Sequence, residues 1–194
     1  METVYKFEKL DINNIEIAKK LCDRYVGEDL YEISFLKSII DKPEELFYLI
    51  FKEEKTVGYF YCYYVNKDDL YEKEKTIFNE SVKELIKSHS KIGIFRSIGI
   101  DEVERKHSLS DYAVALFEGK LKNIGCSIIL APCWKKDDYI PAKKLLTRQN
   151  YKYRCDILKP WKDNTTLKCP FCHKVHCECD ASMFYKILEN KEIS

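Results

Sequence analysis

The sequence predicts an α+β fold, a mixed α/β arrangement in which one mixed sheet is flanked by helices. The β-rich runs at residues 46–52 and 56–65 are separated only by a short polar turn, so they should pair as an antiparallel hairpin. The apolar runs at 92–100 and 126–131 enclose a helical segment, and that order favours a parallel crossover. A sheet that holds both kinds of pairing is mixed.

The same patterns give the order of the elements. In chain order we expect a strand at 4–10, helices at 15–25 and 30–40, the two hairpin strands, a charged surface excursion with a helical pattern at 66–91, a strand at 92–100, a helix at 110–123, a strand at 126–131, a helix at 141–148 and a strand at 151–158. The second helix should end before Pro43, because the residue before a proline avoids the α region. Gly125 suits the end of the 110–123 helix.

Length and composition limit the possible functions. A chain of 194 residues suits one domain, or one domain with a small appendage. The apolar content of 45% excludes disorder, and a net charge of +1 gives no reason to expect a nucleic acid partner. No apolar run approaches the ~20 residues that span a bilayer, and the N-terminus has no signal-peptide core. We therefore expect no membrane partner.

The nine cysteines fall into two groups. Five lie in apolar segments and are expected to be small core residues: Cys22, Cys62, Cys126, Cys133 and Cys155. Free core thiols are typical of a reducing compartment, so we predict a cytoplasmic protein. The other four crowd into the segment CPFCHKVHCEC and need a different explanation.

That segment predicts a metal site at Cys169, Cys172, Cys177 and Cys179. Four thiolates are the ligands that structural zinc prefers, and such a site leaves no open position for catalysis. An iron–sulfur cluster, replacement of a cysteine by His173 or His176, disulfides and metal-free thiols remain alternatives. We expect residues 1–160 to form the main domain and residues 161–194 a small C-terminal metal-binding appendage packed on it.

A second candidate site lies where the 92–100 strand leads into the 110–123 helix. The turn there carries Arg105, Lys106, His107 and Ser108, followed by Leu109 and Ser110. The first N–H groups of a helix have no partner inside it, and together with cationic side chains they favour a phosphate or pyrophosphate. A capped helix start with solvated charges is the simpler alternative.

The order of elements, the Ser97–Asp101 run SIGID and the Arg105–Ser110 turn resemble the GNAT superfamily of acyl-CoA-dependent N-acyltransferases. The resemblance covers residues 4–158 and implies a GNAT-like mixed sheet. It also implies that the turn holds the CoA pyrophosphate, as the family's Arg/Gln-x-x-Gly-x-Gly/Ala turn does. Here Ser108 and Ser110 replace the two glycines, which removes some freedom for positive φ and close approach.

The resemblance further implies cofactor contacts by the strand residues Ile98, Gly99 and Ile100, along which the pantetheine arm would pair. Acyl-CoA would lie in a gap between the strands at Ile98 and Ser127, with the amine entering from the opposite side. The catalytic residues stay unassigned, although Asp101 and Glu102 are candidate bases.

Leu146 stands where the family often has a tyrosine acid. Three tyrosines lie nearby in the sequence with no positional support: Tyr139, Tyr151 and Tyr153.

The function implied is transfer of an acetyl group from acetyl-CoA to an amine of a small molecule or protein, with Zn²⁺ as a structural ion. The alternative is a catalytically degenerate GNAT-fold module that uses its metal-bound tail for protein interaction. The sequence identifies no acceptor, and a homodimer is left open.

Overall fold

The computed structural model describes residues 4–106, 108–164, 169 and 171–188. The predicted mixed sheet with flanking helices is confirmed as seven strands in the order β1-β2-β3-β4-β5-β7-β6. The strands are β1 (Tyr5–Lys9), β2 (Glu45–Lys52), β3 (Lys55–Asn66), β4 (Lys91–Ile100), β5 (Ile128–Lys135), β6 (Lys152–Ile157) and β7 (Asp180–Ile187).

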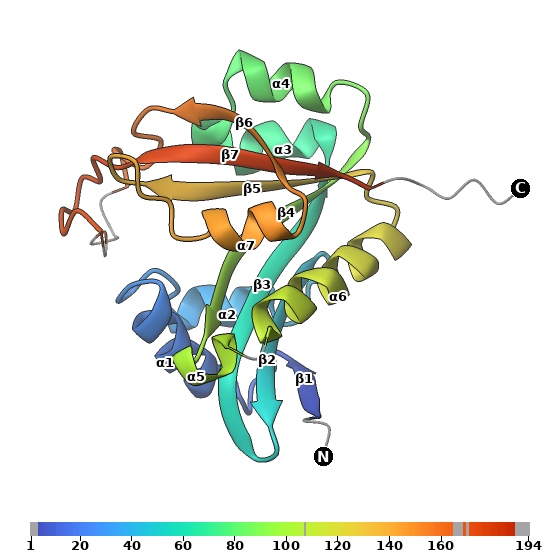
Figure 1. The fold of residues 1–194 in the computed structure, drawn as a ribbon, viewed down its shortest axis with the longest axis vertical. Coiled ribbons are helices and arrows are strands. Elements are labelled where there is room, and N and C mark those ends of the chain that lie inside the picture. Colours follow the sequence, from blue (N-terminus) through green and yellow to red (C-terminus); the bar gives the residue numbers. More distant parts are fainter. Residues whose placement is uncertain (1–3, 107, 165–168, 170, 189–194) are drawn as a thin grey trace, which may run out of the picture.

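Both pairings predicted from the sequence are present. β2 and β3 form an antiparallel hairpin closed at the Lys52–Lys55 pair, and β4 and β5 pair in parallel. The other neighbours in the sheet are antiparallel. In Figure 1, β2 to β4 run steeply down the view while β5, β7 and β6 lie across its upper half, so the sheet changes direction between β4 and β5.

Helices cover both faces of the sheet. They are α1 (Ile15–Tyr25), α2 (Ile33–Ile39), α3 (Lys67–Lys73), the 3₁₀ helix η1 (Lys75–Ile77), α4 (Glu80–Ile86), α5 (Glu102–Arg105), α6 (Leu109–Asn123) and α7 (Lys143–Arg148). The buried side of α1 to α4 forms one apolar core, and the buried side of α6 and α7 forms another on the opposite face (Figure 1). Both cores are rich in aromatic rings, such as Phe60 stacked on Phe117 with centroids 4.2 Å apart.

Several element bounds differ from those expected. Helix α2 begins at Ile33 rather than at residue 30, because Glu32 is still extended and Asp29 has a positive φ. Strand β5 begins two residues later than expected and continues to Lys135. The short helix α5 occupies part of the turn after β4, where the sequence pattern indicated no helix.

The chain returns to the sheet after the cysteine-rich segment. Residues 181–188 belong to the segment expected to form an appendage packed on the domain, but they form most of β7, which lies between β5 and β6. The four cysteines therefore stand in the connection between β6 and β7. The division of the chain at residue 160 stays a prediction, and the sheet itself continues beyond it.

None of the helices within the described residues is long and apolar enough to cross a membrane.

Candidate functional site

Strands β4 and β5 pair over a short stretch and then separate. Residues 92–94 of β4 lie beside residues 128–130 of β5 in parallel register. Both strands continue beyond this stretch, β4 to Ile100 and β5 to Lys135. The edge of β4 that faces β5 is therefore without a strand partner over its last residues, and a gap opens in the middle of the sheet.

A β-bulge lies in β4 where the gap begins. Phe95 is opposite Cys62 and Ser97 is opposite Tyr61, which leaves Arg96 as the extra residue on β4. A bulge bends its strand and re-aims the side chains next to it. The bulge thus accounts both for the divergence of β4 from β5 and for the direction of the Arg96 side chain.

A cavity of about 260 Å³ occupies the gap. Its lining includes residues of both apolar cores. Phe95, Val114 and Leu146 contribute from the α6–α7 side, and Tyr25, Tyr31 and Ile77 from the α1–α4 side. Because the two cores lie on opposite faces of the sheet, the cavity crosses the sheet and is lined from both faces.

A polar group lines the cavity on the α1–α4 side. Arg96 donates a hydrogen bond from NH1 to Glu74 Oε1 at 2.7 Å, and the hydroxyls of Tyr31 and Ser97 lie 3.1 Å apart. Burial opposes the charge on Arg96, but the facing Glu74 carboxylate raises its pKa above the usual value. Burial also raises the pKa of Tyr31, which stays protonated at neutral pH.

Helix α6 contributes to the cavity from the other side of the sheet. Ser108 precedes the helix in the left-handed conformation, with φ at 59°, and Val114 of the same helix lines the cavity. Leu109, Ser110 and Asp111 follow as the first helical residues, whose N–H groups have no acceptor within a helix. Ser108 thus adopts the positive φ for which a glycine would be favoured.

The side chains of Arg105 and Glu104 form hydrogen bonds with neighbouring strands and so hold the turn in place. Arg105 donates from Nε to the Ile100 carbonyl at 2.7 Å. The buried Glu104 accepts hydrogen bonds from Tyr5 at 2.6 Å and from Lys52 at 3.0 Å. Part of the Arg105 guanidinium is therefore committed to the end of β4.

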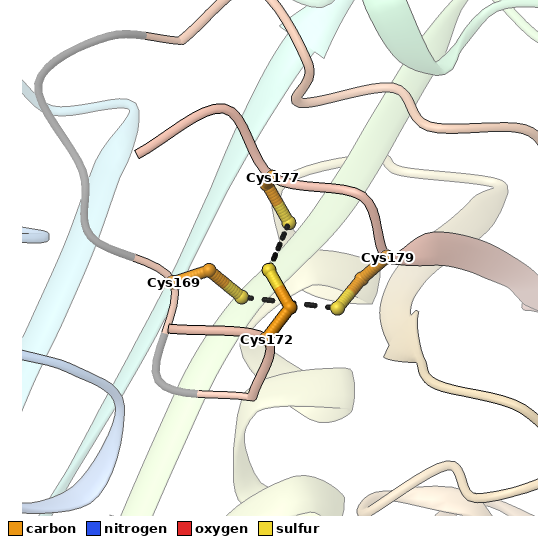
Figure 2. Close-up of side chains that lie close together, drawn as sticks. All are labelled: Cys169, Cys172, Cys177 and Cys179. Carbon is orange, nitrogen blue, oxygen red and sulfur yellow. Dashed lines mark hydrogen bonds between the residues drawn. The ribbon is translucent and has the colours of Figure 1, made fainter. Parts of the chain in front are cut away.

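The four clustered cysteines point toward one another in the β6–β7 connection (Figure 2). Their sulfur atoms all lie within 4.8 Å of each other. The Cys169–Cys179 and Cys172–Cys177 sulfur pairs are 3.8 Å and 3.9 Å apart. Thiolates at ~2.3 Å from one tetrahedral zinc ion would be about 3.8 Å apart, whereas disulfide sulfurs are about 2.05 Å apart. The spacing fits one zinc ion, and all nine cysteines are free thiols.

The surroundings of the cysteines also fit a metal site. Burial opposes ionisation of Cys172, but backbone N–H groups of Glu178 and Lys174 lower its pKa to about 7. His176 is exposed and its Nδ1 lies 3.1 Å from the Lys162 carbonyl, outside the cluster. His173 is exposed with a positive φ and is not part of the group either.

Three aromatic rings connect the cysteine cluster with the cavity. Phe171 lies between two of the cysteines in the sequence, and its ring centroid is 5.2 Å from that of Trp134 on β5. Trp134 and Trp161 meet edge to face at 5.8 Å. All three residues line the cavity, and Trp161 and Phe171 also pack against the buried cysteines. We call these three residues the aromatic wall.

The backbone matches many solved structures. Drosophila melanogaster polyamine N-acetyltransferase superposes with a TM-score of 0.67 at 11% identity, covering 95% of this chain and 100% of that one. Arabidopsis thaliana NAA60, solved with acetyl-CoA, gives 0.68 at 11% identity, covering 96% and 100%. A GNAT-family acetyltransferase from Desulfovibrio desulfuricans gives 0.63 at 9% identity, covering 95% and 99%.

This chain has the GNAT fold. No family profile and no curated protein matches the sequence. The resemblance first noted in the order of elements is thus confirmed at the level of the fold.

Of the described residues predicted for cofactor binding, Ile98 alone lines the cavity. Gly99 and Ile100 continue along β4. Lys106 is exposed in the turn, and His107 lies outside the described residues. The expected gap between Ile98 and Ser127 is wrong in one detail, because Ser127 lies at the end where β4 and β5 pair and the gap opens from Ala131 onward.

The candidate acids and bases have other surroundings. Asp101 accepts a hydrogen bond from Tyr25 and pairs with Arg24 at 3.3 Å and Lys55 at 3.8 Å, so its charge is already matched. Glu102 is exposed at the start of α5. Tyr139 and Tyr153 are 65% and 54% exposed, and neither is among the described residues that line the cavity.

Sequence reasoning missed the residues that line the α1–α4 side of the cavity. Arg96 carried one usable signal, since it is the single charge inside the otherwise uncharged run IGIFRSIGI. Trp161 has the local context of an ordinary core residue, and Tyr31 has no pattern to single it out. They come together only because the β4 bulge, α2 and the β6–β7 connection meet at the gap.

Proposed function

We propose that this chain transfers an acetyl group from acetyl-CoA to an amine of a small molecule or a protein. The observation that carries the proposal is the cavity that crosses the sheet at the β4–β5 gap. A cavity lined from both faces would let a donor and an acceptor meet from opposite sides of the sheet, and such positioning is a large source of rate enhancement. The acetyltransferase names of the structural relatives support the same activity.

Acetyl-CoA would bind through backbone groups on the α6 side. Beyond residue 94 the β5-facing edge of β4 has no strand partner, so backbone groups of the stretch Ile98–Ile100 that face this edge would pair with the amides of the pantetheine arm. The Ile100 carbonyl already accepts a hydrogen bond from Arg105. The pyrophosphate would lie at the α6 N-terminus, on the N–H groups of Leu109 and Ser110.

Cationic side chains of the turn would complete this phosphate site. Arg105, Lys106 and His107 are the residues proposed for that role, and Ser108 would add its hydroxyl.

The proposed acyl transfer depends mainly on backbone groups and on exclusion of water. The amine nitrogen attacks the thioester carbonyl, the C–N bond forms, the C–S bond breaks and CoA leaves as its thiol with the proton the amine gives up. A backbone N–H of β4 would polarise the carbonyl. The apolar lining contributed by Phe95, Val114 and Leu146 would exclude water from the thioester.

Calorimetric titration with acetyl-CoA tests the donor site. We expect micromolar binding to the wild-type chain, and at least roughly tenfold weaker binding to Ser110→Asp, whose carboxylate would face the pyrophosphate. An acidic residue in the first helical turn favours the helix, so the variant should stay folded. Ser34→Asp adds the same charge at an exposed position of α2 and should bind normally.

Two results would contradict parts of this proposal. Absence of binding at millimolar acetyl-CoA would contradict the donor site and leave the non-catalytic GNAT-fold module as the better explanation. Equal weakening in Ser110→Asp and Ser34→Asp would place the pyrophosphate elsewhere than at α6. Transfer is then measured as the mass of acetylated amine formed from a panel of amines.

We also propose that Cys169, Cys172, Cys177 and Cys179 bind one structural Zn²⁺ ion. The sulfur spacing and the N–H groups directed at Cys172 support this assignment. Four thiolates fill the tetrahedral positions of zinc, so the ion would hold the β6–β7 connection in place and would take no part in acyl transfer.

A further inference from the structure

Arg96 is the one charged residue among the described residues that line the cavity, and no described Asp or Glu lines it. We propose that the acceptor is an amino carboxylate, an amine that also bears a carboxylate which Arg96 binds, with an apolar or aromatic side group. This deepens the proposed function and rests on it. It excludes di- and polyamines as preferred acceptors, because their second cation would meet Arg96.

The exposure of Arg96 shows where its side chain points. Arg96 stands on β4, the middle strand of the seven, yet 33% of its side chain is solvent-accessible. Helices cover both faces of the sheet there, so the accessible part faces the cavity. A strand centre is an unfavourable place for a charge unless the charge has a partner or a ligand.

The pairing of Arg96 leaves donors for a ligand. Glu74 accepts one hydrogen bond from Arg96 Nη1 and another from the Tyr63 hydroxyl. A guanidinium has five N–H donors in a rigid fork that matches a carboxylate. Glu74 itself is not among the described cavity-lining residues, whereas Tyr31 and Ser97 are, with their hydroxyls 3.1 Å apart.

The remaining lining on this side suits an apolar group. The aromatic wall of Trp134, Trp161 and Phe171 presents rings to the same cavity. The spacing suits a short amino acid, because Arg96 and Ile98 are two residues apart on one strand, about 7 Å at the usual rise. An amine near Ile98 would thus lie within reach of a carboxylate bound by Arg96.

The two tryptophans allow a binding test that does not depend on catalysis. They are the only tryptophans of the chain, and both line the cavity, so quenching of their fluorescence reports occupancy. The ligands are matched pairs that differ by one carboxylate: phenylalanine against 2-phenylethylamine, and leucine against 3-methylbutylamine. The dication 1,4-diaminobutane is the third kind of ligand. Each is titrated into the zinc-loaded protein saturated with CoA.

We expect the amino acids to bind at least about tenfold more tightly than the matched amines, as a charge-assisted bidentate pair implies. Arg96→Gln would leave Glu74 without its cation, so the decisive variant is Arg96→Gln combined with Glu74→Gln, which removes both charges together. This double variant should lose the preference for the carboxylate. It should keep its acetyl-CoA affinity, which shows that it is folded.

Other outcomes overturn the inference. Binding of the plain amines or of 1,4-diaminobutane as tightly as the amino acids would do so, as would quenching by none of the ligands or an unchanged preference in the double variant. In these cases acetyl-CoA binding and transfer to other amines would still support the proposed function. Absence of acetyl-CoA binding by the wild-type chain would instead contradict the proposed function itself.

Discussion

The two compartments of the cavity are built from different kinds of chemical group. On the α6 side, the proposed donor site consists of backbone groups at the free edge of β4 and at the start of a helix. On the other side, the proposed acceptor site consists of side chains, chiefly Arg96, Tyr31 and the aromatic wall. A backbone site tolerates many side chains, whereas a side-chain site changes its ligand with each substitution. The donor side can therefore stay the same while the acceptor side sets specificity.

The largest expected effect comes from removing a proposed zinc ligand, which should weaken acceptor binding and leave acetyl-CoA binding nearly unchanged. Cys172→Ser removes one proposed zinc ligand, and a structural zinc contributes on the order of 10 kcal/mol in small peptides. We expect the variant to lose its zinc, measured as metal per chain, and to bind acceptor at least about tenfold more weakly, because Trp161 and Phe171 pack on the cluster. Acetyl-CoA affinity should change little.

Cys155→Ser is the matched control for the metal prediction. Cys155 is half-buried on β6 and contacts Asn79, away from the cluster. This variant should keep its zinc and both affinities. If Cys172→Ser weakens acetyl-CoA as much as it weakens the acceptor, the cluster supports the whole fold and does not act on one compartment.

A smaller effect should follow from trimming the aromatic wall alone. Phe171→Ala removes a ring packed on Trp134, and one such aromatic pair contributes ~1 kcal/mol, or about fivefold in affinity. We expect KM for an amine that the protein acetylates to rise by that factor, with zinc content and acetyl-CoA affinity unchanged. Tyr153→Ala removes a half-exposed ring from β6 and should leave all three quantities as they are.

The same contrast explains what the sequence could predict. The hairpin, the crossover and the α6 start each depend on a local pattern of apolar residues, turn residues and charges, so they were found. The place of β7 between β5 and β6 was not, because the strand reaches its neighbours after a connection over residues 158–179 whose path no local pattern encodes. The cysteine cluster was found because its ligands lie within a few residues of each other.

The acceptor side was missed because its residues lie far apart in the sequence. Tyr31, Arg96 and Trp161 come from three distant segments, and each has an ordinary local context. Only Arg96 interrupts a pattern. Its direction depends on the β4 bulge, and the bulge is visible only in the register against β3.

The same substitution, serine to glycine, at two positions of the α6 start tests the backbone conformation of the proposed donor site. Ser108→Gly should stabilise the chain by about 1 kcal/mol, because Ser108 has φ at 59° and a left-handed conformation costs a non-glycine residue about that much. Ser110→Gly, two residues on and inside α6, should destabilise by about 0.5 kcal/mol, since glycine is a poor helix residue. Thermal unfolding should show shifts of opposite sign, and two shifts of the same sign would contradict the left-handed helix start.

The smallest effect concerns a carboxylate at the same helix start. Arg148 donates two hydrogen bonds to Asp111 at 2.9 and 3.0 Å and Gln149 donates another at 2.9 Å. The hydrogen bonds from Arg148, foremost, lower the pKa of Asp111 below its usual value. The pair therefore stabilises the fold above the unfolded-state pKa of ~3.9, and this contribution disappears as the pH falls through the folded-state pKa.

Because both side chains are partly exposed, Asp111→Asn should cost only about 0.5 kcal/mol at pH 7 and less at pH 3. Thermal unfolding of the variant and the wild-type chain across that range measures the difference, with Asp41→Asn, at an exposed position after α2, as the control. A loss that stays constant down to pH 3 would mean that Asp111 acts through hydrogen-bond geometry and not through its charge. A loss that vanishes at low pH would show that Arg148 neutralises a real carboxylate beside the proposed pyrophosphate site.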